Sequence, residues 1–532
     1  MRSQTNRRGS WRVGASLAAA AVVLAALPAL AGPPKVTLQP FIVQASSGTV
    51  AHSAVNTVIA ANGGIGQVVL DLPLVNGVLA NLSTVEVTQL SASYAVSPDQ
   101  KVLTSMLPAK GSPPPPPNRQ LDNVFPQVTG ASTVIAGGNR GQGVGVAVID
   151  TGIAALPDFA GRLRPGVDFT TENNPHLDSY GHGTFVAGLI AGDGSSSGGL
   201  YVGEAPGANL VPVKVAGQSG STTVSTLIRA LQWVKDNTTD NIRVINMSVG
   251  AIPQGPTALN PLDQAVEALW HAGYVVVTSA GNNGASRGTV TSPGDDPFVI
   301  TVGALDDKDT ITPADDAVPS FSSNGPTSWD AWWKPDLIAP GKSVVSVMAP
   351  RSFIWNNFKS ARVGTTNFVG SGTSFAAAIT SGAAAMLLVH NPAATPDNVK
   401  AALLTTTNAG PSAPQDPFQQ GHGVLDVARA IDEPILSIVQ DVGSIPTPAA
   451  GAQIPLISTQ VVSTWATVTA TEQPLYPAPY PFPYTGDATT SQDPGTLTPL
   501  FQSSAWNSSA WNSTTWSSSA WNSSAWNSSA WN

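Results

Sequence analysis

Apolar and polar positions alternate through the middle of the chain in a way that predicts strands and helices in turn. Continuous apolar runs predict buried strands at 143–149, 210–215, 243–247, 274–278 and 299–302. Helical spacing between these runs is clearest at 222–235, where Val224, Leu227, Leu231 and Val234 form one stripe. Further helices are expected at 183–191, 261–271, 376–388 and 396–404. The alternation predicts an α/β fold with a doubly wound parallel sheet.

A smaller pattern precedes this domain, within the segment 32–110. It predicts strands at 37–44, 66–72 and 85–96 and helices at 50–61 and 74–82. Two strand-helix-strand units of this kind suggest a small α+β domain of ferredoxin-like type. The segment 111–120 follows, and its five consecutive prolines predict an extended linker open to proteolysis.

Residues 1–31 have the pattern of a secretory signal peptide. Four arginines precede an apolar stretch at 13–30, which ends in the small-x-small sequence Ala29-Leu30-Ala31. The alternative is a retained membrane anchor, but the alanine-rich core and the cleavage sequence favour removal after Ala31. We therefore expect a secreted, extracellular protein.

The C-terminal part changes character twice. Residues 435–502 are proline-rich and predict an extended spacer, and residues 503–532 repeat Ser-Ser-Ala-Trp-Asn with tryptophan at every fifth position. Evenly spaced tryptophans on a polar chain could bind carbohydrate or a cell surface, because each offers a large apolar face with a polar handle. A disordered low-complexity tail is the alternative, and the sequence leaves both open.

Composition excludes several classes of function. The 532 residues carry a net charge of −9, which argues against a nucleic-acid-binding face. Cysteine is absent, so neither a disulfide scaffold nor a cysteine nucleophile is available. The six histidines include no His-Glu-x-x-His pattern, so a zinc protease is not supported.

The candidate chemistry centres on Ser374, in the sequence Gly372-Thr373-Ser374 at the start of the expected helix. A serine there can cap the helix or act as a nucleophile. Three other short sequences precede it, each near an expected strand end or helix start. They are Val146-Ala147-Val148-Ile149-Asp150-Thr151-Gly152, Tyr180-Gly181-His182-Gly183-Thr184 and Ser279-Ala280-Gly281-Asn282.

Together these sequences resemble the aspartate, histidine, oxyanion and serine motifs of the subtilisin-like serine proteases (subtilases), in that family's chain order. The resemblance covers about 121–434 and implies a subtilisin-like catalytic domain there. It implies that 32–110 is a propeptide that inhibits the enzyme and assists folding. The implied activity is that of a secreted serine endopeptidase, matured by self-cleavage between about Met106 and Gln120.

The resemblance also implies a role for each motif residue. Ser374 would be the nucleophile, His182 its general base and Asp150 the group that orients the imidazole. Asn282 would stabilise the oxyanion together with the Ser374 backbone N–H. No cofactor is required for this chemistry. A catalytically silent adhesion protein that binds through the tryptophan repeats is the alternative from another class.

Substrate-binding positions follow from the same resemblance. Ser248, Val249 and Gly250 match the edge segment that pairs with substrate backbone, and Ala280 and Gly281 flank the pocket for the residue before the cut. Thr291 stands where the family commonly has glycine. A threonine there predicts a shortened pocket for medium-sized uncharged side chains.

Two further positions bear on the resemblance. Asp158 matches one ligand position of the structural calcium that the family often binds, but the neighbouring loop 195–199 is poor in carboxylates. Ala378 stands where the family usually has proline, four residues after the nucleophile. Alanine is the best helix former, so we expect a local backbone adjustment and no loss of activity.

Overall fold

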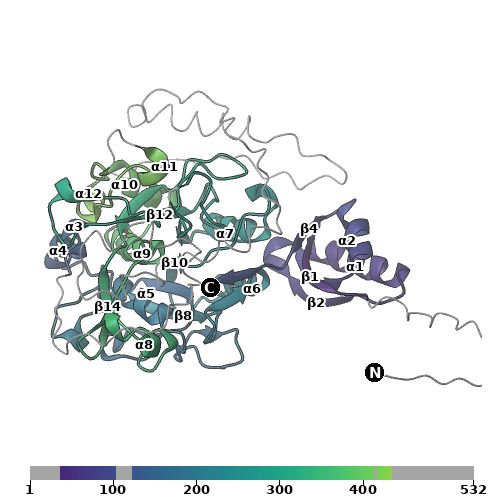
Figure 1. Ribbon diagram of the computed structural model, residues 1–532, viewed down its shortest axis with the longest axis horizontal. Coiled ribbons are helices and arrows are strands. Elements are labelled where there is room, and N and C mark those ends of the chain that lie inside the picture. The colour runs from purple at the N-terminus through teal and green to yellow at the C-terminus, as the bar shows by residue number, and fades with distance from the viewer. Residues whose placement is uncertain (1–35, 104–122, 285, 412–415, 434–532) are drawn as a thin grey trace, which may run out of the picture. The chain divides into compact units, whose positions relative to one another are not determined.

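The central feature of the fold is a seven-stranded sheet in the order β13-β12-β11-β10-β6-β8-β7, in which every neighbouring pair is parallel (Figure 1). The computed structural model describes residues 36–103, 123–284, 286–411 and 416–433. Its sheet strands are β6 Gly145–Asp150, β7 Val167–Asp168, β8 Asn209–Lys214, β10 Ile242–Met247, β11 Val275–Ser279, β12 Ile300–Leu305 and β13 Leu337–Pro340. The predicted parallel α/β sheet is confirmed.

The direction in which strands are added to this sheet reverses at β6. Strand β8 lies on one side of β6 and β10 on the other, so β6 is the topological switch point. In open parallel sheets, binding sites form outside the carboxyl ends of the strands at this point. Strand β6 ends at Asp150, which therefore lies where a site is expected.

Helices accompany the sheet. The longer ones are α5 His182–Ala191, α6 Val224–Asp236, α7 Pro261–His271, α9 Thr373–His390 and α10 Pro396–Thr405. Short helices are α3 Phe125–Val128, α4 Ala131–Ala136, α8 Phe353–Asn357, α11 Pro417–Gln420 and α12 Val427–Asp432. A small antiparallel sheet is formed by β14 Val344–Val347, β15 Arg362–Val363 and β16 Asn367–Gly370. Helix α9 has the length and hydropathy of a membrane span, but 89% of it is buried. Among the described residues it is therefore the central core helix.

A smaller unit precedes the large sheet. It consists of β1 Gln39–Gln44, α1 Gly48–Ala61, β2 Gln67–Leu72, β3 Gly77–Leu82, α2 Thr84–Ser91 and β4 Ala95–Pro98. We call residues 39–103 the N-terminal unit. Strands β1 to β4 form one sheet in the order β2-β3-β1-β4 with antiparallel neighbours, and the element order βαββαβ up to β4 is that of ferredoxin-like folds.

Two elements of the N-terminal unit differ from those predicted. The helix predicted at 74–82 is wrong: Asn76 adopts a left-handed turn at φ 52°, and β3 follows as a buried strand. The strand predicted at 85–96 is also wrong over most of its length, because α2 spans Thr84–Ser91 and strand β4 begins only at Ala95. Ser83 and Glu86 form a capping box, with Glu86 accepting from the Ser83 N–H at 2.7 Å and Ser83 Oγ accepting from the Glu86 N–H at 3.4 Å.

The N-terminal unit contacts the large domain directly, and the described residues from Leu38 onward belong to one compact unit. Strand β5, Lys101–Leu103, pairs antiparallel with β9, Ser221–Thr223, just before α6. Asp99 accepts hydrogen bonds from the Ser225 N–H at 2.8 Å and the Ser225 hydroxyl at 2.7 Å, at the first turn of α6. Burial raises the pKa of this Asp99 carboxyl.

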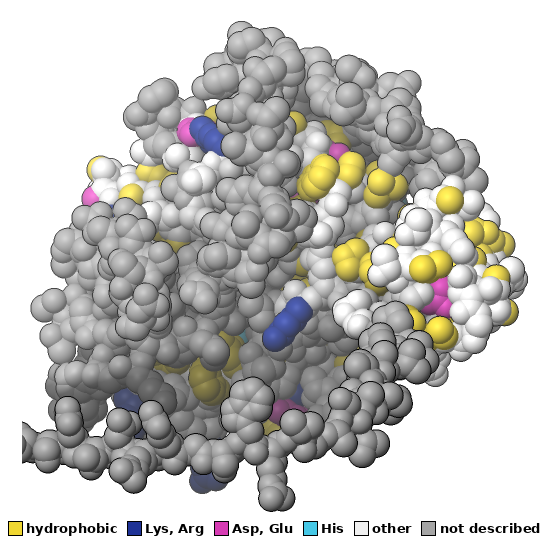
Figure 2. All heavy atoms as spheres, turned by 45° about the vertical axis from the view of Figure 1, so that its right-hand side comes forward, with side chains coloured by type: hydrophobic (Ala, Val, Ile, Leu, Met, Phe, Trp, Pro, Cys, Tyr) yellow, Lys and Arg dark blue, Asp and Glu magenta, His cyan; other side chains and the backbone are white. Residues whose placement is uncertain are grey.

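Charged side chains are few on the visible surface. In the coloured part of the face shown in Figure 2, dark blue and magenta side chains are fewer than yellow ones. This agrees with a chain in which only 11% of residues are charged. The expected signal peptide 1–31, linker 111–120, spacer 435–502 and tryptophan repeat 503–532 lie outside the described residues.

Candidate active site

A buried carboxylate-imidazole pair lies at the end of β6. Asp150 and His182 are both fully buried, and both Asp150 carboxylate oxygens lie 2.8 Å from His182 Nδ1. A carboxylate can only accept, so the imidazole proton must be on Nδ1. That tautomer leaves Nε2 with a lone pair, which is what a general base requires.

The loop before His182 is fixed by Asp178, which sequence reasoning missed. Its carboxylate accepts from the Gly181 N–H at 2.7 Å, from the Thr184 N–H at 2.8 Å and from the Thr151 hydroxyl at 2.8 Å. These bonds cap the start of α5 and tie it to the residue after Asp150. Burial raises the pKa of Asp178. Only its position four residues before His182 could have drawn attention to it.

Close backbone packing holds α5 against the end of β6. Gly183, the second residue of α5, lies so near Gly152 that an added Cβ would stand 2.2 Å from the Gly152 carbonyl oxygen. Any larger residue would push His182 away from Asp150. The glycine therefore has a geometric role in forming the pair.

Ser374 is the second residue of α9, beside the His182 helix. The ring of Phe375 lies 5.8 Å from the His182 ring and 4.5 Å from the Phe185 ring, measured between centroids. Ser374 Oγ is 3.5 Å from the Ser248 carbonyl oxygen, and the Ser248 hydroxyl donates to the Ser374 carbonyl at 2.9 Å. Helix α9 runs unbroken through Ala378, the position at which we expected a local adjustment of the backbone.

Asn282 belongs to the loop after β11, and its side chain contacts the first residue of α9. Its side-chain oxygen accepts from the Thr373 N–H at 2.9 Å and from the Thr373 hydroxyl at 3.1 Å. A backbone N–H can only donate, so this contact identifies Oδ1 and leaves Nδ2 as the donor end of the amide. Thr373 Oγ1 also accepts from the Gly281 N–H at 3.2 Å. Thr373, which sequence reasoning did not assign, thus positions the whole loop.

The expected substrate-binding residues also lie together. After β10, Ala251 exchanges hydrogen bonds of 2.9 and 3.0 Å with Ser292, so this isolated bridge joins the end of the segment Ser248–Gly250 to the residue after Thr291. Thr291 is buried and its N–H donates to the Ala280 carbonyl at 3.0 Å. A Cβ on Gly250 or Gly281 would stand 2.6 or 2.9 Å from the Thr291 hydroxyl.

A cluster of buried acids lies just past Thr291. The Ser292 hydroxyl donates to Asp263 at 2.6 Å, and burial together with neighbouring negative charge raises the pKa of Asp263. The same causes raise the pKa of Asp295 to about 8 and that of Glu267 to about 10, while burial raises the pKa of Asp296. Asp295 and Glu267 are therefore mainly protonated in the folded protein at neutral pH.

This cluster predicts a loss of stability in alkali. Carboxyls with raised pKa values stabilise the folded state fully below their ordinary values, and the effect is lost as pH rises through about 8 for Asp295 and about 10 for Glu267. The test uses a Ser374→Ala background, which avoids self-digestion. Between pH 5 and 9 the unfolding free energy of this background should fall with pH, and the additional substitution Glu267→Gln should make that slope shallower by about 1.4 kcal/mol per pH unit. Urea midpoints at pH 5, 7 and 9 measure it.

The exposed Asp236→Asn provides the control, because its carboxylate is solvated and should leave the pH slope unchanged. An equal pH slope in Glu267→Gln and the unsubstituted background would contradict protonation of the buried cluster.

The expected calcium ligand does not have a calcium-like environment. Asp158 is fully buried, and its carboxylate accepts from the Ser196 N–H at 3.3 and 3.4 Å and from the Ser196 hydroxyl. Calcium takes six to eight oxygen ligands, largely carboxylates and carbonyls. Within the described ranges, no three His, Cys, Asp or Glu residues are grouped to hold a metal. Hydrogen-bond donors occupy the Asp158 carboxylate in this structure, and a structural calcium ion at Asp158 stays a prediction.

Comparison with known proteins gives a consistent result. The model of the subtilase family matches residues 141–423. Serine protease AprX of Bacillus subtilis is 41% identical over 325 residues, which are 59% of this chain and 73% of AprX. Subtilisin DY of Bacillus licheniformis is 35% identical over 303 residues, covering 56% of this chain and 95% of that protein.

A solved structure shows the same fold. The keratinolytic enzyme fervidolysin from Fervidobacterium pennivorans matches with a TM-score of 0.58 and 22% identity, over 76% of this chain and 62% of fervidolysin. This likeness supports the fold alone. The family match spans more than half of the chain and includes every residue of the buried pair, the α9 serine and the Asn282 loop. The chain therefore belongs to the subtilase family and is a serine endopeptidase of the subtilisin type.

Proposed function

We propose that Asp150, His182 and Ser374 are the catalytic triad of this endopeptidase. The observation that carries the proposal is the fully buried Asp150–His182 pair, whose hydrogen bonds set the tautomer that a general base needs. In the proposed reaction, Ser374 Oγ adds to the peptide carbonyl carbon while its proton passes to His182 Nε2. That proton then goes to the departing amine, leaving an acyl-enzyme, and water repeats the sequence to release the acid.

Asn282 and the Ser374 backbone N–H are proposed as the oxyanion donors. The Asn282 amide accepts from Thr373 through its oxygen, so its NH₂ group is the end that would donate to the carbonyl oxygen as negative charge develops there. Such preorganised donors each lower the barrier by about 2.7–4 kcal/mol in related sites. This chemistry needs no cofactor.

Substrate is proposed to bind by strand addition between two edges. One edge is the segment Ser248–Gly250, and the second is β9, which sequence reasoning missed. In the structure, the chain's own β5 is paired with β9. We infer that the N-terminal unit inhibits the enzyme by occupying this edge, and that self-cleavage downstream of Leu103 releases it.

Export and surface association complete the proposal. The arginine-rich, apolar N-terminus suggests secretion, and the tryptophan repeat 503–532 could hold the enzyme on carbohydrate or a cell surface. The adhesion alternative is disfavoured by the buried Asp150–His182 pair, because a binding protein has no need to bury a hydrogen-bonded acid and imidazole. Tail binding itself stays a prediction.

The direct test of the proposed chemistry is covalent labelling. A serine-directed sulfonyl fluoride should stop hydrolysis of a peptide substrate and add once, with the label on Ser374 in a peptide map. A label on another residue, or activity that survives full labelling, would overturn the assignment.

Thr291 should limit the size of the side chain accepted before the cut. Its branched side chain fills the space beside Gly250 and Gly281, so leucine, methionine or alanine should be preferred to phenylalanine or tyrosine. Thr291→Gly should raise kcat/KM for phenylalanine substrates relative to leucine substrates by roughly tenfold or more. A matched peptide series that varies only this residue measures the ratio.

Thr289→Ser is the control in the same segment, because Thr289 bonds to loop carbonyls and its hydroxyl is kept. An unchanged ranking in Thr291→Gly would show that Thr291 does not form the pocket floor.

A further inference from the structure

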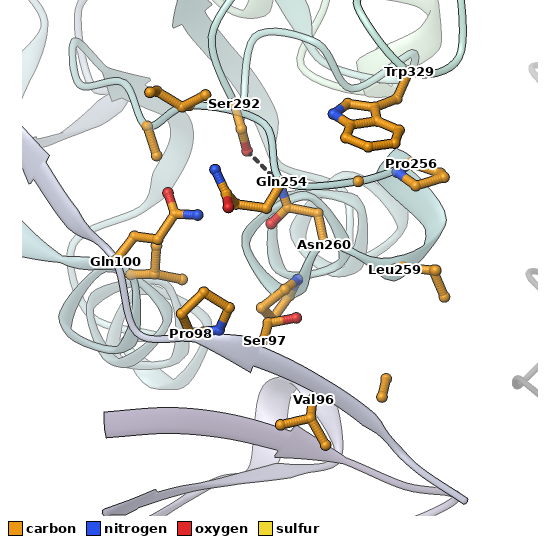
Figure 3. A pocket seen from close by; sticks show the side chains of 16 residues that line it. Val96, Ser97, Pro98, Gln100, Gln254, Pro256, Leu259, Asn260, Ser292 and Trp329 are labelled. Carbon is orange, nitrogen blue, oxygen red and sulfur yellow. Dashed lines mark hydrogen bonds between the residues drawn. The ribbon is translucent and has the colours of Figure 1, made fainter. Parts of the chain in front are cut away.

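A cavity of about 270 Å³ lies beside the substrate edge, between the N-terminal unit and the large domain. Figure 3 shows Val96 and Pro98 of β4 on its lower side and Trp329 on the opposite side. Ile252, Pro256 and Leu259 contribute further apolar surface from the segment that follows the substrate edge. None of the described residues that line the cavity is charged. Its chemistry therefore suits an apolar side chain.

Trp329 is the largest side chain in this lining and is held in place at two points. Its indole Nε1–H donates to the Pro253 carbonyl at 3.2 Å. The next residue, Asp330, accepts from the Thr257 N–H at 2.7 Å. Both bonds fix the Trp329 loop on the segment 253–257, yet the Trp329 side chain remains 55% exposed. A large apolar ring held rigidly in solvent provides a ready contact surface.

The alignment of β5 shows which part of a substrate would reach this cavity. Lys101 pairs with Thr223, and the residues three and five positions before it, Pro98 and Val96, line the cavity. A substrate that replaced β5 on β9 in the same direction would carry its own upstream residues along the same path. Those residues would then lie where β4 lies here and face Trp329 across the cavity, which a large apolar side chain could fill.

We propose that Trp329 is a specificity-determining residue that binds an apolar substrate side chain, three to five positions upstream of the substrate residue paired with Thr223. This inference rests on the proposed strand addition of substrate to β9. Trp329 would thus bind the substrate at a place that none of the triad residues lines, and long substrates with an apolar upstream residue would be cleaved faster than short ones.

The test compares peptides that are identical around the cut. One is short, and the others extend upstream with a single leucine moved through consecutive positions in a serine background. The processed enzyme obtained from the full chain should cleave the best leucine peptide about fivefold or more faster, in kcat/KM, than its all-serine counterpart. In Trp329→Ala this ratio should fall to about one, and Trp329→Phe should retain part of it because the ring remains.

Ile311→Ala removes another exposed apolar side chain, 67% exposed and outside the cavity lining, and should keep the wild-type ratio. An equal leucine-to-serine ratio in wild type, Trp329→Ala and Trp329→Phe would overturn the role of Trp329 while leaving the triad intact. Failure of the wild-type enzyme to cleave any of the peptides would overturn the proposed function and, with it, this subsite.

Discussion

Ser374→Ala should abolish peptide hydrolysis, with kcat reduced on the order of a millionfold, the loss measured when the serine of a related triad is removed. The methyl group cannot attack a carbonyl carbon, so no acyl-enzyme forms. The fold should be unaffected, because the Ser374 hydroxyl makes only a long 3.5 Å contact to the Ser248 carbonyl. Hydrolysis of a chromogenic peptide, followed beside a thermal unfolding curve, separates the two effects.

The same substitution should also stop maturation. If the N-terminal unit is released by self-cleavage, the Ser374→Ala chain should retain that unit while the wild type loses it. Intact-mass measurement of both proteins, expressed in a host that lacks other proteases, gives the answer. Ser381→Ala is the matched control, since Ser381 is buried in α9 and bonds to Asn246 and to the helix backbone. A Ser374→Ala protein that matures like wild type would contradict self-processing.

The large domain could be predicted from sequence because its signals are local and strong. Strands such as β6 and β11 are buried on both faces, so their sequences are nearly continuous apolar runs. Helix α7 begins at Pro261 after an Asn260 cap, and both residues are visible in the sequence. The candidate site residues could be located for the same reason, since each belongs to a short motif at a strand end or helix start.

The elements of the N-terminal unit were harder to predict, because they are short and the spacing of their apolar residues does not distinguish a helix from a strand. Residues 77–82 are nearly all buried, so they have neither the alternation of a surface strand nor the stripe of a surface helix. The capping box at Ser83 and Glu86 was the one local signal that could have placed α2 correctly.

Residues that act through contacts distant in sequence could not be predicted from the residues next to them. Asp178 and Thr373 matter through hydrogen bonds to Thr151 and Asn282, which lie 27 and 91 residues away in sequence. Strand β9 is three residues long, and its strand partner is β5, which lies more than a hundred residues earlier in the sequence. Trp329 likewise acquires a role only through the loop that holds it on Pro253.

The second large effect is expected from Asp150→Asn, and the hydrogen bonds around Asp150 show why. Oδ1 accepts from the Thr151 N–H at 2.8 Å, and both oxygens lie 2.8 Å from His182 Nδ1. An asparagine would keep its oxygen on the Thr151 N–H, because that group can only donate. Its NH₂ group would then face His182 Nδ1 and force the imidazole proton onto Nε2.

With the proton on Nε2, His182 cannot accept the proton of Ser374, and the imidazolium formed during attack would lose its negative partner. We therefore expect kcat to fall about ten-thousandfold, as in a related triad with the same substitution, with a much smaller change in KM. Asp178→Asn is the comparison, because that carboxyl supports the loop and does not touch the imidazole. Asparagine can still accept from part of this loop, so the loss there should be smaller. Retention of more than a tenth of wild-type kcat in a folded Asp150→Asn enzyme would show that Asp150 does not set the tautomer of His182.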